Sequence, residues 1–247
     1  MTRLADLKVK IFADGADLEG IKAMYAKPWI KGFTTNPTLM RKAGVADYAS
    51  FAQEVLRAVP DRPISFEVFA DEFDEMERQA LEIASWGRNV YVKIPVTNTR
   101  RQFSGPVIQR LSQNGVQVNV TAVFMSEQVK AVTESLALGP PAIISVFAGR
   151  IADTGVDPVP VMREALKIMQ AKPKAELIWA SPRELLNIIQ ADEIGCHIIT
   201  VTSDILGKLS LLGKDHDDYS LETVEMFHKD ALAAGYVIPE SRRGRVA

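Results

Sequence analysis

The chain alternates between short apolar runs and longer segments whose apolar residues recur at helical spacing. The apolar runs are rich in β-branched residues, which predicts strands at 9–13, 32–36, 64–70, 90–95, 116–123, 142–147, 176–181 and 197–202. The intervening segments repeat their apolar positions with the period of a helix, which predicts helices at 17–25, 48–59, 72–86, 105–113, 126–138, 158–170, 183–191 and 203–212. Each predicted strand is thus followed by a predicted helix.

This alternation predicts one α/β domain, a (β/α)8 TIM barrel, and disfavours a doubly wound open sheet. The 247 residues fit one such barrel, although two small domains would also fit that length. No linker rich in Gly, Pro or Ser divides the chain, so we expect residues 1–247 to form a single barrel domain. A further helical pattern at 220–234 lies within a predicted C-terminal helix and tail, 215–247, and this helix either caps the barrel or packs on a neighbouring subunit.

Charge and cysteine content narrow the functional classes. The formal net charge is −2 with both signs scattered, which disfavours nucleic acid and membrane surfaces as partners. The one basic cluster, Arg242, Arg243 and Arg245, lies at the C-terminal end, where we expect a solvated tail. A lone cysteine, Cys196, and an N-terminus without a signal-peptide pattern predict a cytoplasmic protein. No apolar stretch approaches transmembrane length.

One lysine interrupts a predicted buried strand. Lys93 lies in the apolar run 90–96. Because burial disfavours the ammonium, such a lysine has a fraction of neutral amine that can attack a carbonyl carbon and form a Schiff base. The alternative is a lysine at a strand end that reaches solvent beside Pro95.

Polar residues at the ends of the other strands favour the first interpretation. Seven of the eight predicted strands carry them, and the C-terminal ends of the strands form the catalytic face of such barrels. Residues two apart on a strand share a face, so Asn119 and Thr121 both point into the barrel mouth, as do Ser145 and Phe147. The polar set comprises Asp14, Thr34, Thr35, Asn36, Glu67, Lys93, Asn119, Thr121, Ser145, Arg150, Ser181 and Arg183.

One lysine and two carboxylates, Asp14 and Glu67, match class I aldol chemistry. The lysine forms an imine, one carboxylate moves protons during dehydration of the carbinolamine, and the other removes the hydroxyl proton that starts carbon–carbon cleavage. The protonated imine is the electron sink, so we expect no metal and no other cofactor. His197, His216 and His228 share no ligand spacing with a carboxylate cluster.

Arg150 and Arg183 follow adjacent predicted strands, and Ser181 lies beside the second arginine. This placement suits a phosphate near the late strands of a barrel. Each arginine alone is more often a surface charge at a helix start, and it is the placement of both after adjacent strands that favours phosphate binding.

The residues that carry this chemistry resemble the transaldolase and fructose-6-phosphate aldolase family over nearly the whole chain. The motifs that match in order and spacing are Phe12-Ala13-Asp14, Thr34-Thr35-Asn36-Pro37-Thr38, Ser65-Phe66-Glu67-Val68, Val92-Lys93-Ile94-Pro95, Asn119-Val120-Thr121, Ser145-Val146-Phe147-Ala148-Gly149-Arg150 and Ala180-Ser181-Pro182-Arg183. The resemblance implies a barrel enzyme that acts on sugar phosphates.

The resemblance also implies individual roles. Lys93 is similar to the Schiff-base lysine, and Asp14 to the aspartate that acts as base and acid on the C4 hydroxyl. Glu67 resembles the carboxylate that works through a catalytic water, with Thr121 orienting that water. The implied substrate-binding positions are Thr35, Asn36, Asn119, Ser145, Phe147, Arg150, Ser181 and Arg183, of which Arg150, Ser181 and Arg183 resemble the phosphate-binding set.

Two positions separate the branches of this family. Transaldolases carry Glu and Phe where fructose-6-phosphate aldolases carry Gln and Tyr, and this chain has Glu67 and Phe147. A tyrosine hydroxyl can protonate the enamine and release dihydroxyacetone, whereas phenylalanine leaves the enamine for an acceptor aldehyde. Ordinary strand packing is the other explanation of Phe147. Pro182 departs from the aromatic residue that the family carries there, which leaves a sulfonated or otherwise modified sugar open.

The sequence therefore predicts a cytoplasmic, homo-oligomeric transaldolase of pentose phosphate metabolism. It would move a dihydroxyacetone unit from a ketose phosphate to an aldose phosphate through an imine on Lys93. Three alternatives remain from the sequence: an aldolase that releases free dihydroxyacetone, a transaldolase that acts on a modified ketose, and a catalytically silent barrel that binds sugar phosphates. Binding alone needs no buried amine, and this disfavours the silent barrel.

Overall fold

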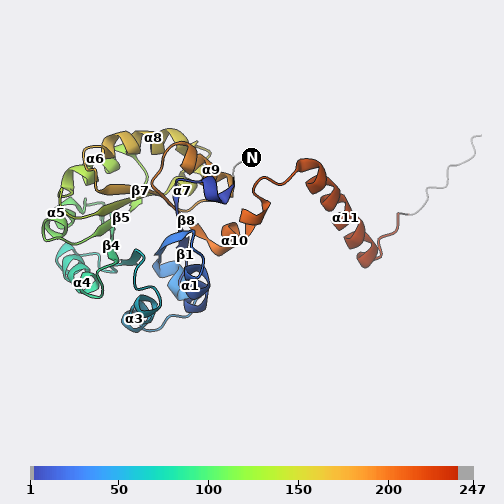
Figure 1. The fold of residues 1–247 in the computed structure, drawn as a ribbon. Coiled ribbons are helices and arrows are strands. Elements are labelled where there is room, and N and C mark those ends of the chain that lie inside the picture. The colour runs from blue at the N-terminus through green and yellow to red at the C-terminus, as the bar shows by residue number, and fades with distance from the viewer. Residues whose placement is uncertain (1–2, 239–247) are drawn as a thin grey trace, which may run out of the picture.

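A computed structural model describes residues 3–238 and shows eight parallel strands closed into a barrel in sequence order (Figure 1). The strands are β1 (Lys10–Asp14), β2 (Ile30–Thr34), β3 (Ile64–Glu67), β4 (Val90–Pro95), β5 (Val118–Val123), β6 (Ala142–Val146), β7 (Ala175–Trp179) and β8 (Ile198–Thr202). The helices that follow them are α1 (Leu18–Tyr25), α2 (Pro37–Lys42), α3 (Tyr48–Ala58), α4 (Phe73–Ser85), α5 (Gly105–Gln113), α6 (Ser126–Ser135), α7 (Ala148–Ala152), α8 (Pro158–Met169), α9 (Leu186–Glu193), α10 (Ser203–Leu206) and α11 (His216–Ala234). The predicted (β/α)8 barrel with a C-terminal helix is confirmed.

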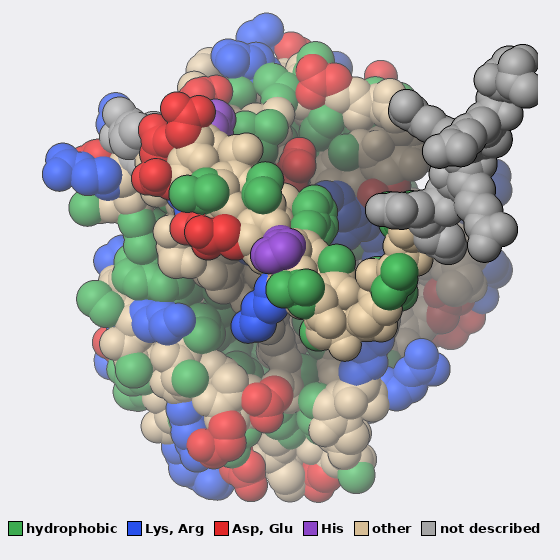
Figure 2. Space-filling view, turned by 90° about the vertical axis from the view of Figure 1, so that its right-hand side faces the viewer, with side chains coloured by type: hydrophobic (Ala, Val, Ile, Leu, Met, Phe, Trp, Pro, Cys, Tyr) green, Lys and Arg blue, Asp and Glu red, His purple; other side chains and the backbone are tan. Residues whose placement is uncertain are grey.

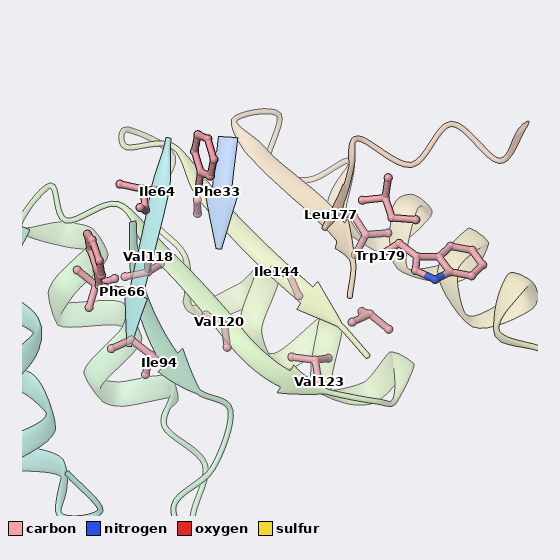
Figure 3. Close-up of a cluster of buried hydrophobic side chains, with 14 of the residues drawn as sticks. Phe33, Ile64, Phe66, Ile94, Val118, Val120, Val123, Ile144, Leu177 and Trp179 are labelled. Carbon is pink, nitrogen blue, oxygen red and sulfur yellow. The ribbon is translucent and has the colours of Figure 1, made fainter. Parts of the chain in front are cut away.

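Most of the hydrophobic core lies between the strands and the helices around them (Figure 3). On β3, Ile64 and Phe66 belong to this core and are fully buried, whereas Ser65 and Glu67 alternate with them and belong to the barrel interior. The two-residue period of each strand therefore assigns one set of side chains to the core and the other set to the barrel interior.

A second, smaller apolar cluster closes the barrel below its mouth. Its buried members include Phe12, Tyr91, Ile143, Ile178 and Ile198, which we call the barrel floor. Four of these residues stand two positions before a polar residue of the mouth on the same strand, so the polar set rests directly on this floor. The floor is tightly packed at β2, where a Cβ on Gly32 would lie 2.4 Å from the ring of Phe12.

Several predicted element ends are wrong, and local hydrogen bonds explain why. The second strand ends at Thr34 because Asn36 caps α2, with its Oδ1 accepting from Leu39 N at 3.0 Å. The third strand ends at Glu67 because the N–H groups that follow, of Phe69 and Ala70, donate to the side chain of Gln79. The seventh ends before Ser181, whose φ of 59° is incompatible with a strand.

Two helices are absent from the sequence prediction because they are too short for a periodic pattern. These are α2, which begins with Pro37 after the Asn36 cap, and α7 after β6. The predicted helix 203–212 is instead α10 followed by a 3-10 helix, Gly207–Leu211. The last helix begins at His216, earlier than predicted, because Asp215 caps it by accepting from the N–H groups of Asp217 and Asp218.

Helix α11 extends away from the barrel, so it does not cap the barrel mouth (Figure 1). No residue of α11 is buried, and its exposed apolar residues include Leu221, Val224, Phe227 and Leu232. Figure 2 views this side of the molecule and shows hydrophobic side chains exposed among charged and polar ones. Between residues 3 and 238, no helix is both long and apolar enough to cross a membrane. The basic cluster at 242–245 lies outside the described residues.

Candidate active site

A cavity of about 570 Å³ opens at the C-terminal ends of the strands, above the barrel floor. Most of the polar residues predicted from the sequence line it, and they come from β1, β2, β3, β4, β5, β6, α7 and the loops after β2 and β7. Its lining includes Asp14, Thr34, Asn36, Lys42, Glu67, Lys93, Thr121, Ser145, Phe147, Arg150, Ser181, Arg183 and Thr200. The barrel thus brings together residues that are far apart in the chain.

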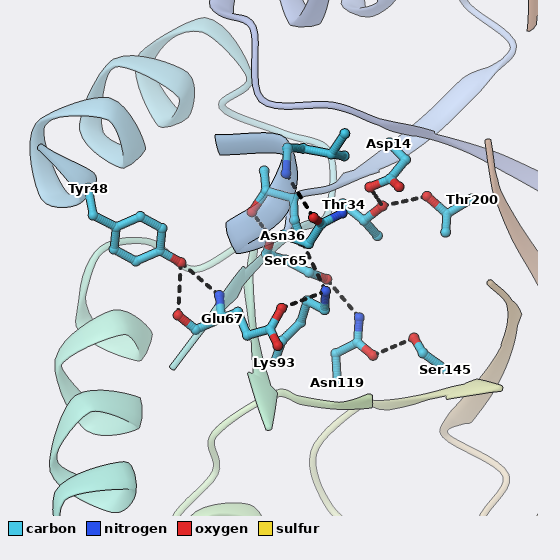
Figure 4. Close-up of polar contacts among 12 residues, drawn as sticks. Asp14, Thr34, Asn36, Tyr48, Ser65, Glu67, Lys93, Asn119, Ser145 and Thr200 are labelled. Carbon is cyan, nitrogen blue, oxygen red and sulfur yellow. Dashed lines mark hydrogen bonds and ion pairs between the residues drawn. The ribbon is translucent and has the colours of Figure 1, made fainter. Parts of the chain in front are cut away.

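Lys93 is buried at this cavity and pairs with Glu67 on the adjacent strand (Figure 4). The two residues are in register across β3 and β4, and Lys93 Nζ lies 2.9 Å from Glu67 Oε2. The ammonium also donates to the main-chain oxygen of Thr35 at 3.0 Å. Only 6% of Lys93 is exposed, so its side chain does not reach bulk solvent beside Pro95.

Asp14 ends β1 on another side of the cavity and belongs to a chain of hydroxyl groups. Thr34 Oγ1 donates to Asp14 Oδ1 at 2.8 Å, and Thr200 Oγ1 on β8 lies 2.5 Å from Thr34 Oγ1. Because Thr34 gives its proton to Asp14, Thr200 is the donor to Thr34. Burial raises the pKa of Asp14 above its ordinary value, while the charge of Lys93 and the hydrogen bond from Thr34 partly offset that rise. Asp14 is thereby held nearer to the protonated form than an exposed aspartate.

A hydrogen-bonded row crosses the barrel interior beside Lys93. Ser145 Oγ donates to Asn119 Oδ1 at 2.7 Å, and Asn119 Nδ2 donates to Ser65 Oγ at 3.0 Å (Figure 4). Asn119 is fully buried and adjoins Lys93 in the β4–β5 register. The row fixes the orientation of the Asn119 amide, since each amide atom has a defined partner.

Thr121 lies on the same face of β5 as Asn119 and lines the cavity just before an irregularity in that strand. The pairing with β6 shifts between Val120 and Val123, and Ala122 has a φ of 60°. The Thr121 hydroxyl oxygen is buried and makes no hydrogen bond to any residue in the described part of the chain. A buried hydroxyl of this kind is suited to hold a small polar group in the cavity.

The predicted anion-binding residues Arg150, Ser181 and Arg183 line the cavity where the start of α7 contacts the loop after β7. Gly149 makes this contact possible, because a Cβ there would lie 1.5 Å from the carbonyl oxygen of Ser181. Arg183 Nη1 donates to Ser181 Oγ at 3.0 Å. The guanidinium of Arg150 stacks over the ring of Phe147, 4.9 Å from its centroid.

Arg183 also has a carboxylate partner that the sequence did not indicate. Its Nε and Nη2 donate to Asp153 Oδ1 and Oδ2 at 2.8 and 2.5 Å, and both side chains are about half exposed. The hydrogen bond and charge of Arg183 lower the pKa of Asp153. Asp153 therefore neutralises part of the positive charge at this end of the cavity.

Two predicted substrate-binding residues do not line the cavity. Thr35 is fully buried, with its hydroxyl donating to the carbonyl of Ser65, and it contributes its own carbonyl to Lys93. Asn119 lies beneath the cavity surface in the row described above. Asn36 does line the cavity, although its Oδ1 is used to cap α2.

Sequence reasoning assigned no role to several polar residues of this site. Thr200 and Ser65 could have been found, because they occupy interior positions in the alternation of β8 and β3. Tyr48 and Asp153 lie on or beside helices, and no periodic signal connects them to the strand ends. Among the residues that the structure describes, no group of three His, Cys, Asp or Glu side chains is arranged to hold a metal ion.

Comparison with known proteins agrees with these motifs. A family model described as Transaldolase/Fructose-6-phosphate aldolase matches residues 11–238. The chain is 36% identical over 201 residues to a probable transaldolase of Dehalococcoides mccartyi, covering 80% of this chain and 88% of the relative. It is 33% identical over 202 residues to a probable transaldolase of Methanococcus maripaludis, covering 81% of this chain and 89% of that protein.

The fold is also similar to that of more distant proteins. A crystal structure of a "putative dihydrodipicolinate synthase family protein" from Coccidioides immitis superimposes with a TM-score of 0.59 at 13% identity. The match covers 94% of this chain and 80% of that one. At this identity the likeness concerns the barrel fold alone.

Proposed function

Because the chain belongs to the transaldolase/fructose-6-phosphate aldolase family, we propose that it is a class I transaldolase that forms a Schiff base through Lys93. The observation that carries this proposal is the buried Lys93 in the cavity, paired with Glu67 at 2.9 Å and sharing the cavity with Asp14. An amine, a carboxylate at its side and a second carboxylate within the same cavity are the groups that class I aldol chemistry requires.

The reaction begins when Lys93 Nζ loses a proton and attacks the ketose carbonyl at C2. Glu67 is the nearest base, and it supports both this deprotonation and the loss of water that converts the carbinolamine into the imine. The buried hydroxyl of Thr121 suits a group that orients the water involved in these transfers.

Cleavage of the C3–C4 bond follows when Asp14 removes the proton of the C4 hydroxyl. The electrons of the breaking bond move into the imine, an aldose leaves, and a three-carbon enamine remains on Lys93. A carboxyl group with a raised pKa suits this role, because it accepts the proton and later returns it to the new hydroxyl when the acceptor aldehyde adds.

Glu67 and Phe147 favour group transfer over release of free dihydroxyacetone. Phe147 lines the same cavity as Lys93 and offers no proton to the enamine. The substrate class that we propose is ketose and aldose phosphates, with Arg150, Ser181 and Arg183 around the anionic group. A sulfonated ketose is the alternative, and the pairing of Arg183 with Asp153 supports it because a sulfonate carries one charge fewer than a phosphate dianion.

Trapping of the imine tests this proposal directly. Borohydride reduction with fructose 6-phosphate should add a three-carbon mass to the peptide that contains Lys93, and Lys93→Met should remove both the adduct and turnover. Lys31→Met, which replaces an exposed lysine, is the matched control and should label as wild type does. Labelling at Lys31 or Lys208 in place of Lys93 would contradict the mechanism.

A second measurement tests the transfer step. The protein is incubated with fructose 6-phosphate with and without erythrose 4-phosphate, and product formation should require the acceptor. The pentose phosphate pathway, a cytoplasmic location and a homo-oligomeric state remain part of this proposal. Sedimentation of the purified protein tests the last of these.

A further inference from the structure

At Glu67, the last residue of β3, the strand is paired with β4 on one side but has no strand neighbour on the β2 side. The last register pair between β2 and β3 joins Thr34 to Ser65, after which the chain of β2 turns into α2. Thr35 N still donates to Ser65 O at 3.2 Å, so the polar main-chain groups of Ser65 face β2. Those of Glu67 face the same side, since main-chain direction in a strand repeats every two residues.

The main-chain N–H and C=O of Glu67 therefore point to where β2 would continue, and a side chain occupies that place. The Tyr48 hydroxyl on α3 accepts from Glu67 N at 2.7 Å and donates to Glu67 O at 3.0 Å (Figure 4). One phenolic hydroxyl thus satisfies the main-chain donor and acceptor of Glu67, which the next residue of a neighbouring strand would otherwise pair with. On the opposite side, β4 holds the strand end through Val68 N, which donates to Lys93 O at 3.2 Å.

The ring of Tyr48 is held by aromatic packing that does not depend on its hydroxyl. It packs edge-on against Phe66, Phe69 and Trp86, with ring centroids 6.1, 4.6 and 5.6 Å away. Burial raises the pKa of Tyr48, so the hydroxyl remains a donor over the working pH range. The ring sets the position of the hydroxyl, and the hydroxyl sets the position of Glu67.

We propose that Tyr48 is a positioning residue that sets the rate of imine formation by fixing the main chain of Glu67. The Glu67 carboxylate is held 2.9 Å from Lys93 Nζ only if the strand end from which it projects is fixed. This inference rests on the proposed function, because it concerns the step in which Glu67 assists Lys93. A shift of about 1 Å in a catalytic group is enough to lower a rate by about a hundredfold.

The test compares Tyr48→Phe with Tyr25→Phe. Both remove one tyrosine hydroxyl with a hydrogen bond, but Tyr25 donates to Asp61 and does not line the cavity. Single-turnover borohydride quenching with fructose 6-phosphate should show imine formation about tenfold slower in Tyr48→Phe. The KM for fructose 6-phosphate should change by less than about twofold, because the anion-binding residues are untouched. Tyr25→Phe should match wild type in both.

A double-mutant cycle separates positioning from a general effect on the fold. In a Glu67→Gln background, Tyr48→Phe should change the rate of imine trapping by less than about twofold, because the group that it positions is already lost. The same tenfold loss in both backgrounds would overturn the proposal. If wild type forms the imine and Tyr48→Phe forms it at the same rate, the proposal is also overturned.

Hydrogen exchange gives a readout that needs no turnover. The amide of Glu67 should exchange faster in Tyr48→Phe than in wild type or Tyr25→Phe, since its acceptor is removed. Unchanged exchange there would contradict the proposed contact. If wild type forms no imine at Lys93, the proposed function fails first, and the kinetic role of Tyr48 fails with it.

Discussion

Lys93 Nζ and Glu67 Oε2 lie 2.9 Å apart across the β3–β4 pair, and the Cα atoms of the two residues are in register. The register places the carboxylate beside the amine, and Tyr48 on α3 hydrogen-bonds the main chain of Glu67 at the end of β3. In this arrangement the ammonium is compensated by Glu67 and by the carbonyl of Thr35. We expect this pair to stabilise the folded protein, and in the proposed mechanism it also supplies the base that the amine needs.

The first prediction concerns the stability of this pair. Glu67→Gln should lower the free energy of unfolding by about 2 kcal/mol, because it leaves the buried charge of Lys93 without its counter-ion. The same change in a Lys93→Met background should have a much smaller effect. Urea denaturation of the four proteins measures the coupling. Equal losses in both backgrounds would mean that the pair adds nothing to stability.

The barrel and much of its mouth could be predicted because both follow from periodicity. Alternation of strands and helices fixed the architecture, and the two-residue period on each strand placed Lys93, Ser145 and Thr121 on the inside. The floor beneath them follows from the same rule, since Tyr91 and Ile143 stand two positions earlier. These features can be predicted because they depend only on the sequence of each strand and its neighbouring residues.

Contacts between side chains from distant segments could not be predicted in this way. Tyr48 reaches Glu67 only because β2 stops at Thr34, and that end depends on the Asn36 cap of α2. The pairing of Asp153 with Arg183 depends on the close approach that a glycine allows between α7 and β7. In both cases the contact depends on a short helix, α2 or α7, which the periodic pattern of the sequence does not reveal.

The second prediction concerns pH and Asp14. Its folded-state pKa is raised, mainly by burial, so the folded protein binds an extra proton between the unfolded pKa, about 4, and the raised value. Stability contributed by this group is therefore lost as pH rises through that interval. Asp14→Asn should flatten this dependence and raise the free energy of unfolding at about pH 7 by on the order of 1 kcal/mol, while abolishing cleavage.

Urea denaturation at several pH values between about 4 and 8 measures this effect. Asp230→Asn, on the exposed face of α11, is the control and should keep the wild-type pH dependence. If Asp14→Asn is less stable than wild type at neutral pH, the carboxylate is stabilised in its ionised form, and the assignment of a raised pKa is wrong.

The third prediction concerns Arg183. Arg183→Ala should lower kcat/KM for phosphorylated ketoses, because a charged contact to the anion is lost. The decrease should correspond to a loss of roughly 2–4 kcal/mol of transition-state stabilisation. Unphosphorylated dihydroxyacetone donors should be affected little. Steady-state kinetics with both substrate types measures the difference. Equal losses would show that Arg183 serves the structure and not the anion.

The fourth prediction uses Asp153 to separate the two substrate classes. Asp153→Asn should raise kcat/KM for a phosphorylated ketose about threefold more than for its sulfonated analogue, because removing a carboxylate near the anion favours the more highly charged group. Competition between the two ketoses in one reaction measures this ratio directly. An equal change for both would mean that Asp153 only orients the Arg183 guanidinium.

The last prediction concerns Phe147, which distinguishes transfer from release. Phe147 shares the cavity with Lys93, and its ring packs against Phe124 and the guanidinium of Arg150. Phe147→Tyr adds a phenolic hydroxyl with little change in ring packing, and this hydroxyl supplies a general acid for the enamine on Lys93. The variant should therefore release more dihydroxyacetone from fructose 6-phosphate without an acceptor and transfer less to erythrose 4-phosphate.

The quantity to measure is the ratio of free dihydroxyacetone to transferred product, in wild type and in Phe147→Tyr. Phe124→Tyr is the matched control, because it adds the same hydroxyl to the neighbouring ring, which does not line the cavity. The ratio should rise in Phe147→Tyr only. A wild type that already releases dihydroxyacetone as fast as it transfers it, with no change on adding the hydroxyl, would place the enzyme with the aldolases. In that case Phe147 serves packing, and the acceptor-dependent function proposed here is wrong.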